Sequence, residues 1–316
     1  MKSDSDKLSV VEKVGYGLGD MAANFIFQTM VMFQLAFYTD TFGITAAAAG
    51  TLLVVVRVFD AIFDPIMGAI ADRTNTRWGT FRPWVLWTAV PFGIMGFLTF
   101  ITLAMRGSVV LYYFKYYVGR ENLFSAFNVA GTTATIIGIF FSKGLAMRYG
   151  KRAVFIAGLA GTSVFTLAFL PLPPSAIAPM FAAEILRQFV YGLTIPLLWA
   201  MMADVADYSE WRNRRRATGI VFSAIVFALK AGLGFGGAIT GYVLAHYGYV
   251  PNVDQTATAL NGIRLTMSAF SAIGFAVCAA CLFFYSIDKA AEIRITSELK
   301  ERRKLYATPG RELAQR

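Results

Sequence analysis

Three charged residues lie inside one long apolar segment of the sequence. Arg57, Asp60 and Asp64 interrupt the run from Leu52 to Asp72, and Pro65 follows them. Spacings of three and four residues place the three charges on one stripe of a helix. A charge near the centre of a bilayer costs about 2.5–3.5 kcal/mol on insertion scales, so the stripe must face partners or a water-filled passage. The carboxylate pair therefore predicts a site for a cation inside a membrane span.

The composition of the chain is typical of a membrane protein. Of its 316 residues, 57% are hydrophobic and 15% are charged, and the mean hydropathy is +0.56. Soluble domains carry about 25% charged residues. The net charge of +10 comes from basic residues in short loops between apolar runs. That distribution follows membrane topology and argues against a nucleic-acid partner.

Few residues could support enzyme chemistry. His246 is the single histidine, so a histidine-based metal site or catalytic triad cannot be built. Cys278 and Cys281 have C-x-x-C spacing, but they fall in an apolar helix and are expected to pack there. We therefore expect no enzyme, and no cofactor beyond a coupling ion.

Eight apolar runs are long enough to cross a bilayer, which predicts an all-α, polytopic helical bundle. Their bounds are roughly Tyr16–Tyr38, Ala46–Ala71, Pro83–Tyr117, Phe124–Met147, Ala153–Leu170, Ala178–Ala203, Gly219–Leu244 and Leu265–Ile287. The third run is too long for one span and too short for two spans with a turn. We expect a single crossing there that projects past the membrane, with Gly107 as a candidate bend.

Basic residues predict the orientation of the spans. They follow the second, fourth, sixth and last runs, whereas the connections on the other side hold only Arg120 as a cation. By the positive-inside rule, both termini are cytoplasmic, in a multi-pass protein of the cell inner membrane. Residues 289–316 are expected to form a basic tail near the membrane surface.

Two spans end in a glycine followed by charged residues. Gly68–Arg73 closes the second run and Gly144–Arg152 closes the fourth. The glycine permits close helix approach, and the charges can pair across the loop. The pattern resembles a loop motif that recurs in each six-helix half of the major facilitator superfamily. Ordinary glycines beside positive-inside arginines are the alternative. Six spans would need about 180 residues, and the two copies lie much closer, which predicts a missing central block.

Further motifs resemble the glycoside–pentoside–hexuronide:cation symporters of that superfamily. They are Gly15-Tyr-Gly-Leu-Gly-Asp20, Arg57-Val-Phe-Asp60-Ala-Ile-Phe-Asp64-Pro65 and Arg77-Trp-Gly-Thr-Phe-Arg82-Pro83. Residues to about Thr99 are similar to the family's helices one to three, and residues from about Thr102 to helix seven onward. The resemblance implies a major facilitator bundle of about eight transmembrane helices instead of twelve.

The resemblance also implies a division of the chain and a function. Residues 1–101 would be the remnant of the N-terminal half, 102–288 the C-terminal half, and 289–316 the cytoplasmic tail. The implied activity is symport of a xyloside, galactoside or glucuronide with Na⁺, Li⁺ or H⁺ by alternating access. The alternative is a remnant that transports nothing, because family helices four and five also contact sugar. Loss of helices would expose polar faces unless the chain forms an oligomer.

The resemblance assigns residues to the two substrates. Asp60 and Asp64 would bind the cation, as a Na⁺ site if the carrier is sodium-coupled, although pairing of Arg57 with Asp60 is compatible with this. Asp20 would bind the sugar, because a carboxylate accepts two hydroxyl hydrogen bonds; an interfacial helix-start aspartate is the alternative. Lys230 would face the cavity, or else make a structural ion pair.

Aromatic and gating candidates complete the set. Tyr112, Tyr113 and Trp199 could stack on a sugar ring, but aromatic residues in helices more often pack. Residues with expected structural or gating roles are Arg57, Asp72, Arg73, Arg148, Asp204, Asp207 and Arg212. Of these, Asp204 and Asp207 lie near a cytoplasmic helix end, and arginines 212–216 beyond them would close the inner side.

Two charged sites lie inside other spans. Glu184 and Arg187, at i and i+3, predict a structural ion pair within one helix. Arg106, at the junction of the two halves, is expected to face the lumen or Asp20.

Overall fold

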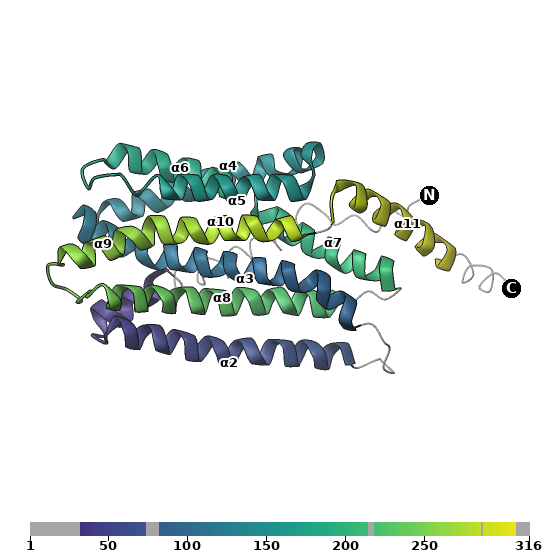
Figure 1. Cartoon of the computed structure of the whole chain (residues 1–316), viewed down its shortest axis with the longest axis horizontal. Coiled ribbons are helices and arrows are strands. Elements are labelled where there is room, and N and C mark those ends of the chain that lie inside the picture. Colours follow the sequence, from purple (N-terminus) through teal and green to yellow (C-terminus); the bar gives the residue numbers. More distant parts are fainter. Residues whose placement is uncertain (1–31, 74–81, 214–217, 286, 308–316) are drawn as a thin grey trace, which may run out of the picture.

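The computed structural model describes residues 32–73, 82–213, 218–285 and 287–307. Within these ranges the side chains at 60–61, 64–92, 212–213, 218–224 and 303–307 are left undescribed. The described chain is helical and contains no strand. Figure 1 shows the long helices side by side along one axis, with α11 beyond one end of the bundle.

The elements follow one another in chain order, with η marking π- and 3₁₀-helices. They are η2 (Phe37–Thr41), α2 (Ala46–Arg73), α3 (Arg82–Tyr112), η3 (Tyr113–Val118), α4 (Leu123–Tyr149), α5 (Lys151–Leu167), α6 (Ile177–Gly192), α7 (Ile195–Asn213), α8 (Thr218–His246), α9 (Ala257–Leu265), η4 (Thr266–Phe270), α10 (Ser271–Cys281), η5 (Leu282–Phe284) and α11 (Lys289–Ala307). The break between α6 and α7 precedes Pro196, whose ring nitrogen cannot donate a helical hydrogen bond.

Five stretches of the described chain are long and apolar enough to cross a bilayer. They are Gly93–Val118, Leu123–Tyr149, Ile177–Trp211, Ile225–His246 and Ala257–Phe284. These coincide with the third, fourth, sixth, seventh and eighth predicted spans. The second and fifth runs form α2 and α5, while the first lies largely outside the described residues. The polytopic helical membrane protein is confirmed, and the number of eight spans stays a prediction.

The overlong third run forms one continuous helix. α3 passes through Gly107 without interruption, and its hydrogen-bond pattern changes only at Tyr113, where η3 begins. Gly119, at φ +70°, ends the helix in a left-handed conformation that glycine adopts without steric cost. The third run thus forms one helix, as a single crossing requires, and the irregular segment lies at its end rather than at Gly107.

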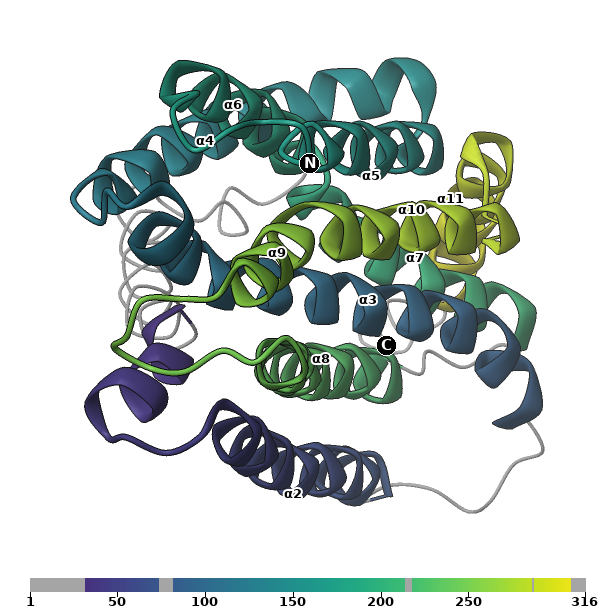
Figure 2. The ribbon, with the colours of Figure 1, turned by 60° about the vertical axis from the view of Figure 1, so that its left-hand side comes forward.

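Helix α8 packs between α2 and α3 and presents a separate glycine face to each (Figure 2). Gly234, Gly237 and Gly241 face α2, while Gly232 and Gly236 face α3. A Cβ at Gly241 or Gly236 would meet backbone atoms of the neighbouring helix. Close backbone approach through small residues is the usual way in which helices associate in lipid. The glycine-rich sequence of α8 therefore makes it the central helix of this part of the bundle.

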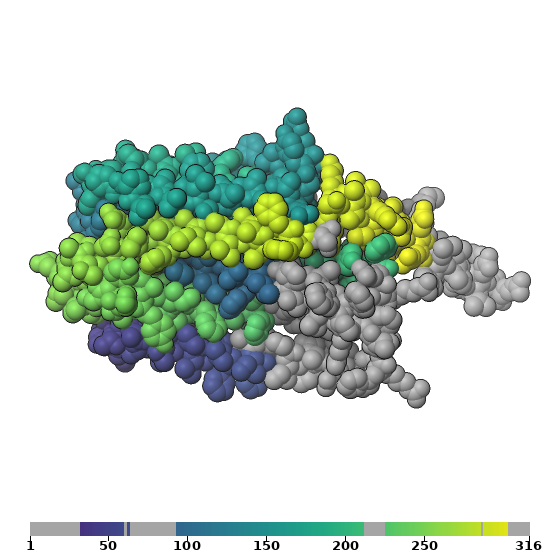
Figure 3. All heavy atoms as spheres, viewed as in Figure 1, coloured from purple at the N-terminus to yellow at the C-terminus, as the bar shows by residue number. Residues whose placement is uncertain are grey.

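The tail is a helix docked on the bundle. In α11, Ile295 and Leu299 are buried, and Trp211 of α7 donates its indole N–H to Glu298 at 2.6 Å. Arg302 donates to the carbonyl oxygen of Trp211 at 3.0 Å. In Figure 3 the described part of α11 is coloured yellow and lies beside α7. The basic tail is thus a packed element of the protein over these residues.

The two cysteines pack in the apolar core, as predicted. Cys278 is fully buried, Cys281 is half-buried, and neither forms a disulfide. Cys278 belongs to a core cluster that α3, α5, α7 and α10 share, which includes Met95, Phe155 and Met201. A second cluster, around Phe114 and Phe169, fills the other end of the bundle.

Candidate sugar and ion sites

The charged stripe of the second span lies on α2, and its first member faces the bundle. Arg57 packs against α8 at Gly234, where a Cβ would overlap the Cβ and Cγ atoms of Arg57. Phe59 and Phe63 are more than half exposed and lie on the opposite side of α2. Helix α2 therefore has an apolar outer face and a face packed on α8.

Several predicted site residues fall outside the described side chains. Asp60 and Asp64 are helical positions of α2, three and seven residues after Arg57, but their side chains are not described. Asp20 lies outside the described chain. The side chains of Asp72, Arg73 and Arg212 are also undescribed. Their roles stay predictions, and the absence of a three-residue metal cluster applies only to the described residues.

The two tyrosines predicted as sugar contacts are fully buried. The hydroxyl of Tyr112 hydrogen-bonds with Thr39 at 2.8 Å, and that of Tyr113 donates to the sulfur of Met180 at 3.9 Å. Neither ring has an open face in this conformation, so stacking on a sugar would require rearrangement. Trp199 differs, because 45% of its surface is exposed on α7.

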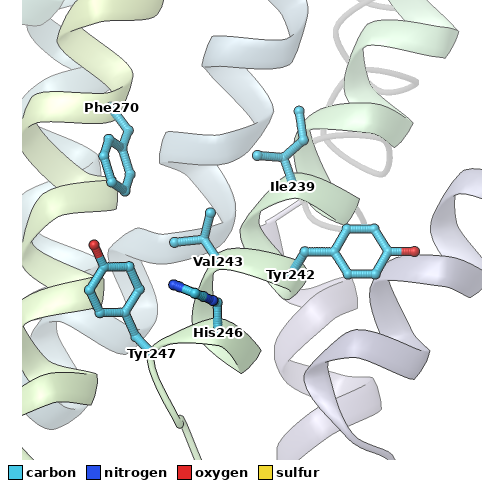
Figure 4. Close-up of a pocket in the computed structure, with 6 residues that line it drawn as sticks. All are labelled: Ile239, Tyr242, Val243, His246, Tyr247 and Phe270. Atoms are coloured by element: carbon cyan, nitrogen blue, oxygen red, sulfur yellow. The ribbon is translucent and has the colours of Figure 1, made fainter.

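An open pocket lies between the end of α8 and η4 (Figure 4). It has a volume of about 420 Å³ and is lined by Ile239, Tyr242, Val243, His246, Tyr247 and Phe270. The ring of Tyr242 turns toward α2, where its hydroxyl hydrogen-bonds with Thr51 at 2.8 Å. The lining includes none of the residues predicted to bind sugar or cation. Its mainly apolar walls suit neither hydroxyl-rich sugars nor ions.

A buried ionic triad joins α3 to α6. Arg106 donates to Glu184 at 2.6 and 3.4 Å, and Arg187 donates to the same carboxylate at 3.0 and 2.7 Å. All three side chains are almost completely enclosed. The guanidinium of Arg106 also lies 5.1 Å from the ring centroid of Phe169. The Glu184–Arg187 pair is confirmed, and Arg106 pairs with Glu184, a contact that neither expectation for it included. The expected contact with Asp20 lies outside the described residues.

A polar cluster, here called the Asp40 cluster, contains Asp40, Lys115, Tyr116, Tyr249 and Asn252. The carboxylate of Asp40 accepts hydrogen bonds from Lys115 at 2.6 Å, Tyr249 at 2.8 Å and Tyr116 at 3.2 Å. Asn252 donates its amide to the backbone oxygen of Asp40 at 2.7 Å and accepts from Lys115 at 3.0 Å. The cluster therefore ties η2 to η3 and to the α8–α9 loop.

The environment of Asp40 stabilises its charged form. Burial by itself would raise the pKa of this carboxyl, but hydrogen bonds from Lys115, Tyr249 and Thr39 outweigh it and lower the pKa below its usual value. Burial raises the pKa of Tyr249, and its contacts with Tyr116 and Asp40 add to this effect. Asp40 is thus an anion and Tyr249 a neutral donor at neutral pH.

Another polar cluster, here called the Lys151 cluster, contains Lys151, Asp204 and Glu292. The ammonium of Lys151 lies 2.7 Å from Asp204 on α7 and 2.9 Å from Glu292 on α11. Burial would lower the pKa of Lys151, but hydrogen bonds to the two carboxylates outweigh it and raise the pKa. The predicted ion pairing of Asp204 thus involves α5, in addition to any contact with arginines 212–216.

The basic residues of the second glycine-and-charge motif contact other elements of the bundle. Lys151 and Arg152 follow Gly150, and Arg152 donates to the carbonyl oxygens of Leu282 and Phe283 at 3.2 and 2.9 Å. Arg148 lies over the ring of Tyr149, 5.3 Å from its centroid. The charges therefore hold α5 against η5, α7 and α11, and the expected pairing across the loop itself stays a prediction.

Comparison with known proteins gives a family and several relatives. The family described as MFS/sugar transport protein matches residues 15–110 and 98–289. The putative glycoside/cation symporter YagG of Escherichia coli strain K12 is 27% identical, with 94% of this chain and 96% of that protein covered. The isoprimeverose transporter of Lactiplantibacillus pentosus is 26% identical, with 92% and 91% covered.

The alignment with YagG extends over 442 positions, whereas this chain has 316 residues. Long stretches of YagG therefore have no counterpart in this chain. A deletion relative to full-length members fits this length difference. The two family matches together cover most of the chain and include α2 through α10. The chain therefore belongs to the MFS/sugar transport protein family, as a shortened member of the glycoside–pentoside–hexuronide:cation symporters, which are membrane transporters and not enzymes.

Proposed function

We propose that the protein is a cation-coupled sugar symporter that works by alternating access. Support comes from relatives named as a glycoside/cation symporter, an isoprimeverose transporter and a glucuronide carrier homolog. The observation that carries the proposal is the charged stripe of α2, whose first member, Arg57, packs on α8 instead of facing outward. An acidic pair on such a stripe suits a monovalent cation.

In this proposal, Asp60 and Asp64 bind Na⁺, Li⁺ or H⁺, and Asp20 and Lys230 contact the sugar. Trp199 is the aromatic candidate that needs no unpacking, because its ring is already partly exposed. Cation binding strengthens sugar binding between the remnant of the N-terminal half and the C-terminal half, and the loaded carrier then changes its open side. Both termini lie in the cytoplasm.

We place the junction of the halves within α3. The two family matches overlap between residues 98 and 110, which supports a junction there. Helix α3 continues through this interval without a break. A single helix that enters as part of one half and ends as part of the other preserves the direction of all later spans. Residues 1–101, 102–288 and 289–316 are the proposed remnant, C-terminal half and tail.

The test is uptake of a labelled xyloside, galactoside and glucuronide into vesicles that contain the purified chain. A Na⁺ gradient with a protonophore separates Na⁺ coupling from H⁺ coupling. We expect cation-dependent uptake that Asp60→Asn and Asp64→Asn each abolish. Asp254→Asn, an exposed acid in the α8–α9 loop, is the matched control and should transport normally. Absence of cation-dependent uptake by the unaltered chain would favour a transport-inactive remnant.

A further inference from the structure

We propose that Arg106 and Arg187 form a binding site for an anion inside the bundle. The anion would be either the carboxylate of an acidic sugar or a small inorganic anion such as chloride. The acidic-sugar alternative rests on the proposed function. The first observation is the charge balance of the triad. Among the residues that the structure describes, two guanidinium groups share the single carboxylate of Glu184, which leaves one excess positive charge in this set.

The excess charge is almost fully enclosed. The side chains of Arg106, Glu184 and Arg187 are 6%, 3% and 3% exposed, and all lie in stretches long enough to span the membrane. An ionised group in such a place is costly unless a counter-charge accompanies it. Glu184 neutralises one arginine, so a second negative charge would complete the balance.

Two donors of the triad are also unused. Arg106 Nε and Arg187 Nη1 are buried and have no hydrogen-bond partner in the described structure. Buried donors are nearly always paired in proteins, because desolvation without a hydrogen bond costs free energy. A water molecule could accept a hydrogen bond from an N–H group, but it would leave the excess charge in place. An anion would accept these hydrogen bonds and also neutralise the charge.

The chemistry of the donors fits a carboxylate. Guanidinium groups present planar, directional N–H pairs that match carboxylate oxygens, and they stay protonated even when buried. A uronide differs from the corresponding glycoside by a carboxylate in place of a hydroxymethyl group. One excess charge with two free donors would therefore favour the uronide. Because the triad is closed in this conformation, a sugar would reach it only in another state of the transport cycle.

The test measures binding to the purified full chain in nanodiscs. The probes are 4-nitrophenyl β-D-glucuronide and 4-nitrophenyl β-D-glucoside, which differ only at C6, and sodium chloride against sodium methanesulfonate at equal ionic strength. We expect the glucuronide to bind at least tenfold more tightly than the glucoside, or chloride to raise the melting temperature. Either response shows anion binding, and the two arms separate substrate from free ion.

The variants assign the response to the triad. Arg106→Gln leaves the neutral Glu184–Arg187 pair, so it should fold and lose the anion response. If it does not fold, Arg187→Gln serves the same purpose, because it leaves the Arg106–Glu184 pair. Glu184→Gln adds to the excess charge and should strengthen the response, whereas Arg120→Gln, at an exposed loop residue, should not change it.

The outcomes separate this proposal from the function above. Equal binding of both sugars together with no effect of chloride, or a response that Arg106→Gln leaves unchanged, would overturn the anion site while leaving sugar symport intact. A chloride effect that Arg106→Gln removes, without binding of either sugar, would support the anion site and count against sugar transport.

Discussion

The Asp40 cluster and the Lys151 cluster are both partly buried, but they lie at opposite ends of the bundle and are built differently (Figure 1). The Asp40 cluster has one carboxylate that a lysine and two tyrosine hydroxyls contact, together with an asparagine. The Lys151 cluster has one ammonium between two carboxylates. The first relies on neutral hydroxyl donors around an anion, and the second on charge pairing alone.

The clusters also differ in what they connect. Asp40 precedes α2, while Lys115 lies in η3 at the end of α3 and Tyr249 lies in the α8–α9 loop. Lys151, Asp204 and Glu292 all follow the proposed junction in α3. If the two halves rock against each other as proposed, the contacts of Asp40 must change, whereas the Lys151 cluster can move as one body. The difference suggests a gate at one end and a brace at the other.

The largest expected effect is that of Asp40→Asn. The substitution keeps the shape but removes the charge that holds Lys115 and accepts from Tyr249, so we expect a loss of about 2–3 kcal/mol of stability. Thermal unfolding of the purified protein measures it, with Asp254→Asn as a control. Asp40→Lys combined with Lys115→Asp should recover part of the loss. Equal stability of Asp40→Asn and the unaltered chain would show that the Asp40 cluster does not stabilise the fold.

Acid should reproduce part of this effect. The folded-state pKa of Asp40 lies below its usual value of about 3.9, so the unfolded chain takes up the proton first as pH falls. The contribution of Asp40 is complete above that value and is lost as pH falls through the lower folded pKa. The stability difference between the unaltered chain and Asp40→Asn should be constant from pH 5 to pH 7 and shrink below pH 4. A constant difference at all pH values would contradict the lowered pKa.

Most of the long helices could be predicted from the sequence, but their packing could not. Long apolar runs predict the helices because no other structure satisfies its backbone in lipid over one segment. The continuous junction helix followed from the length of the third run. The glycine faces of α8 are visible as Gly232, Gly234, Gly236, Gly237 and Gly241, although which face meets which helix depends on the order of packing.

The polar clusters could not be predicted in the same way. Asp40 and Tyr249 are 209 residues apart, and Arg106 and Glu184 are 78 apart. Spacing along a chain reveals partners only within a helix, as for Glu184 and Arg187. The one available signal was composition: Arg106 and Lys115 are isolated cations in an apolar run, so each required an acidic partner from another helix.

A smaller effect is expected for Lys151→Met. The substitution leaves Asp204 and Glu292 without their shared cation, which should cost about 1–2 kcal/mol because the group is only partly buried. Because the pKa of Lys151 is raised above the ordinary lysine value, its contribution should not vary between pH 5 and pH 9 through its own titration. In vesicles, Lys151→Met should lower protein stability without changing the KM for sugar. A changed KM would show that this end also opens during transport.

The smallest expected effect is that of Trp211→Phe, which tests how firmly the tail braces α7. The phenyl ring keeps most of the apolar contact but cannot donate to Glu298, so we expect a loss of stability smaller than that of Lys151→Met. Lys300→Gln is the control, because Lys300 is an exposed residue of the same helix. Protease resistance of residues 289–307 and thermal unfolding measure the two variants. If Trp211→Phe releases the tail while transport stays unchanged, the brace serves assembly alone. A matching loss of transport would instead make the docked tail part of the moving body that carries Lys151.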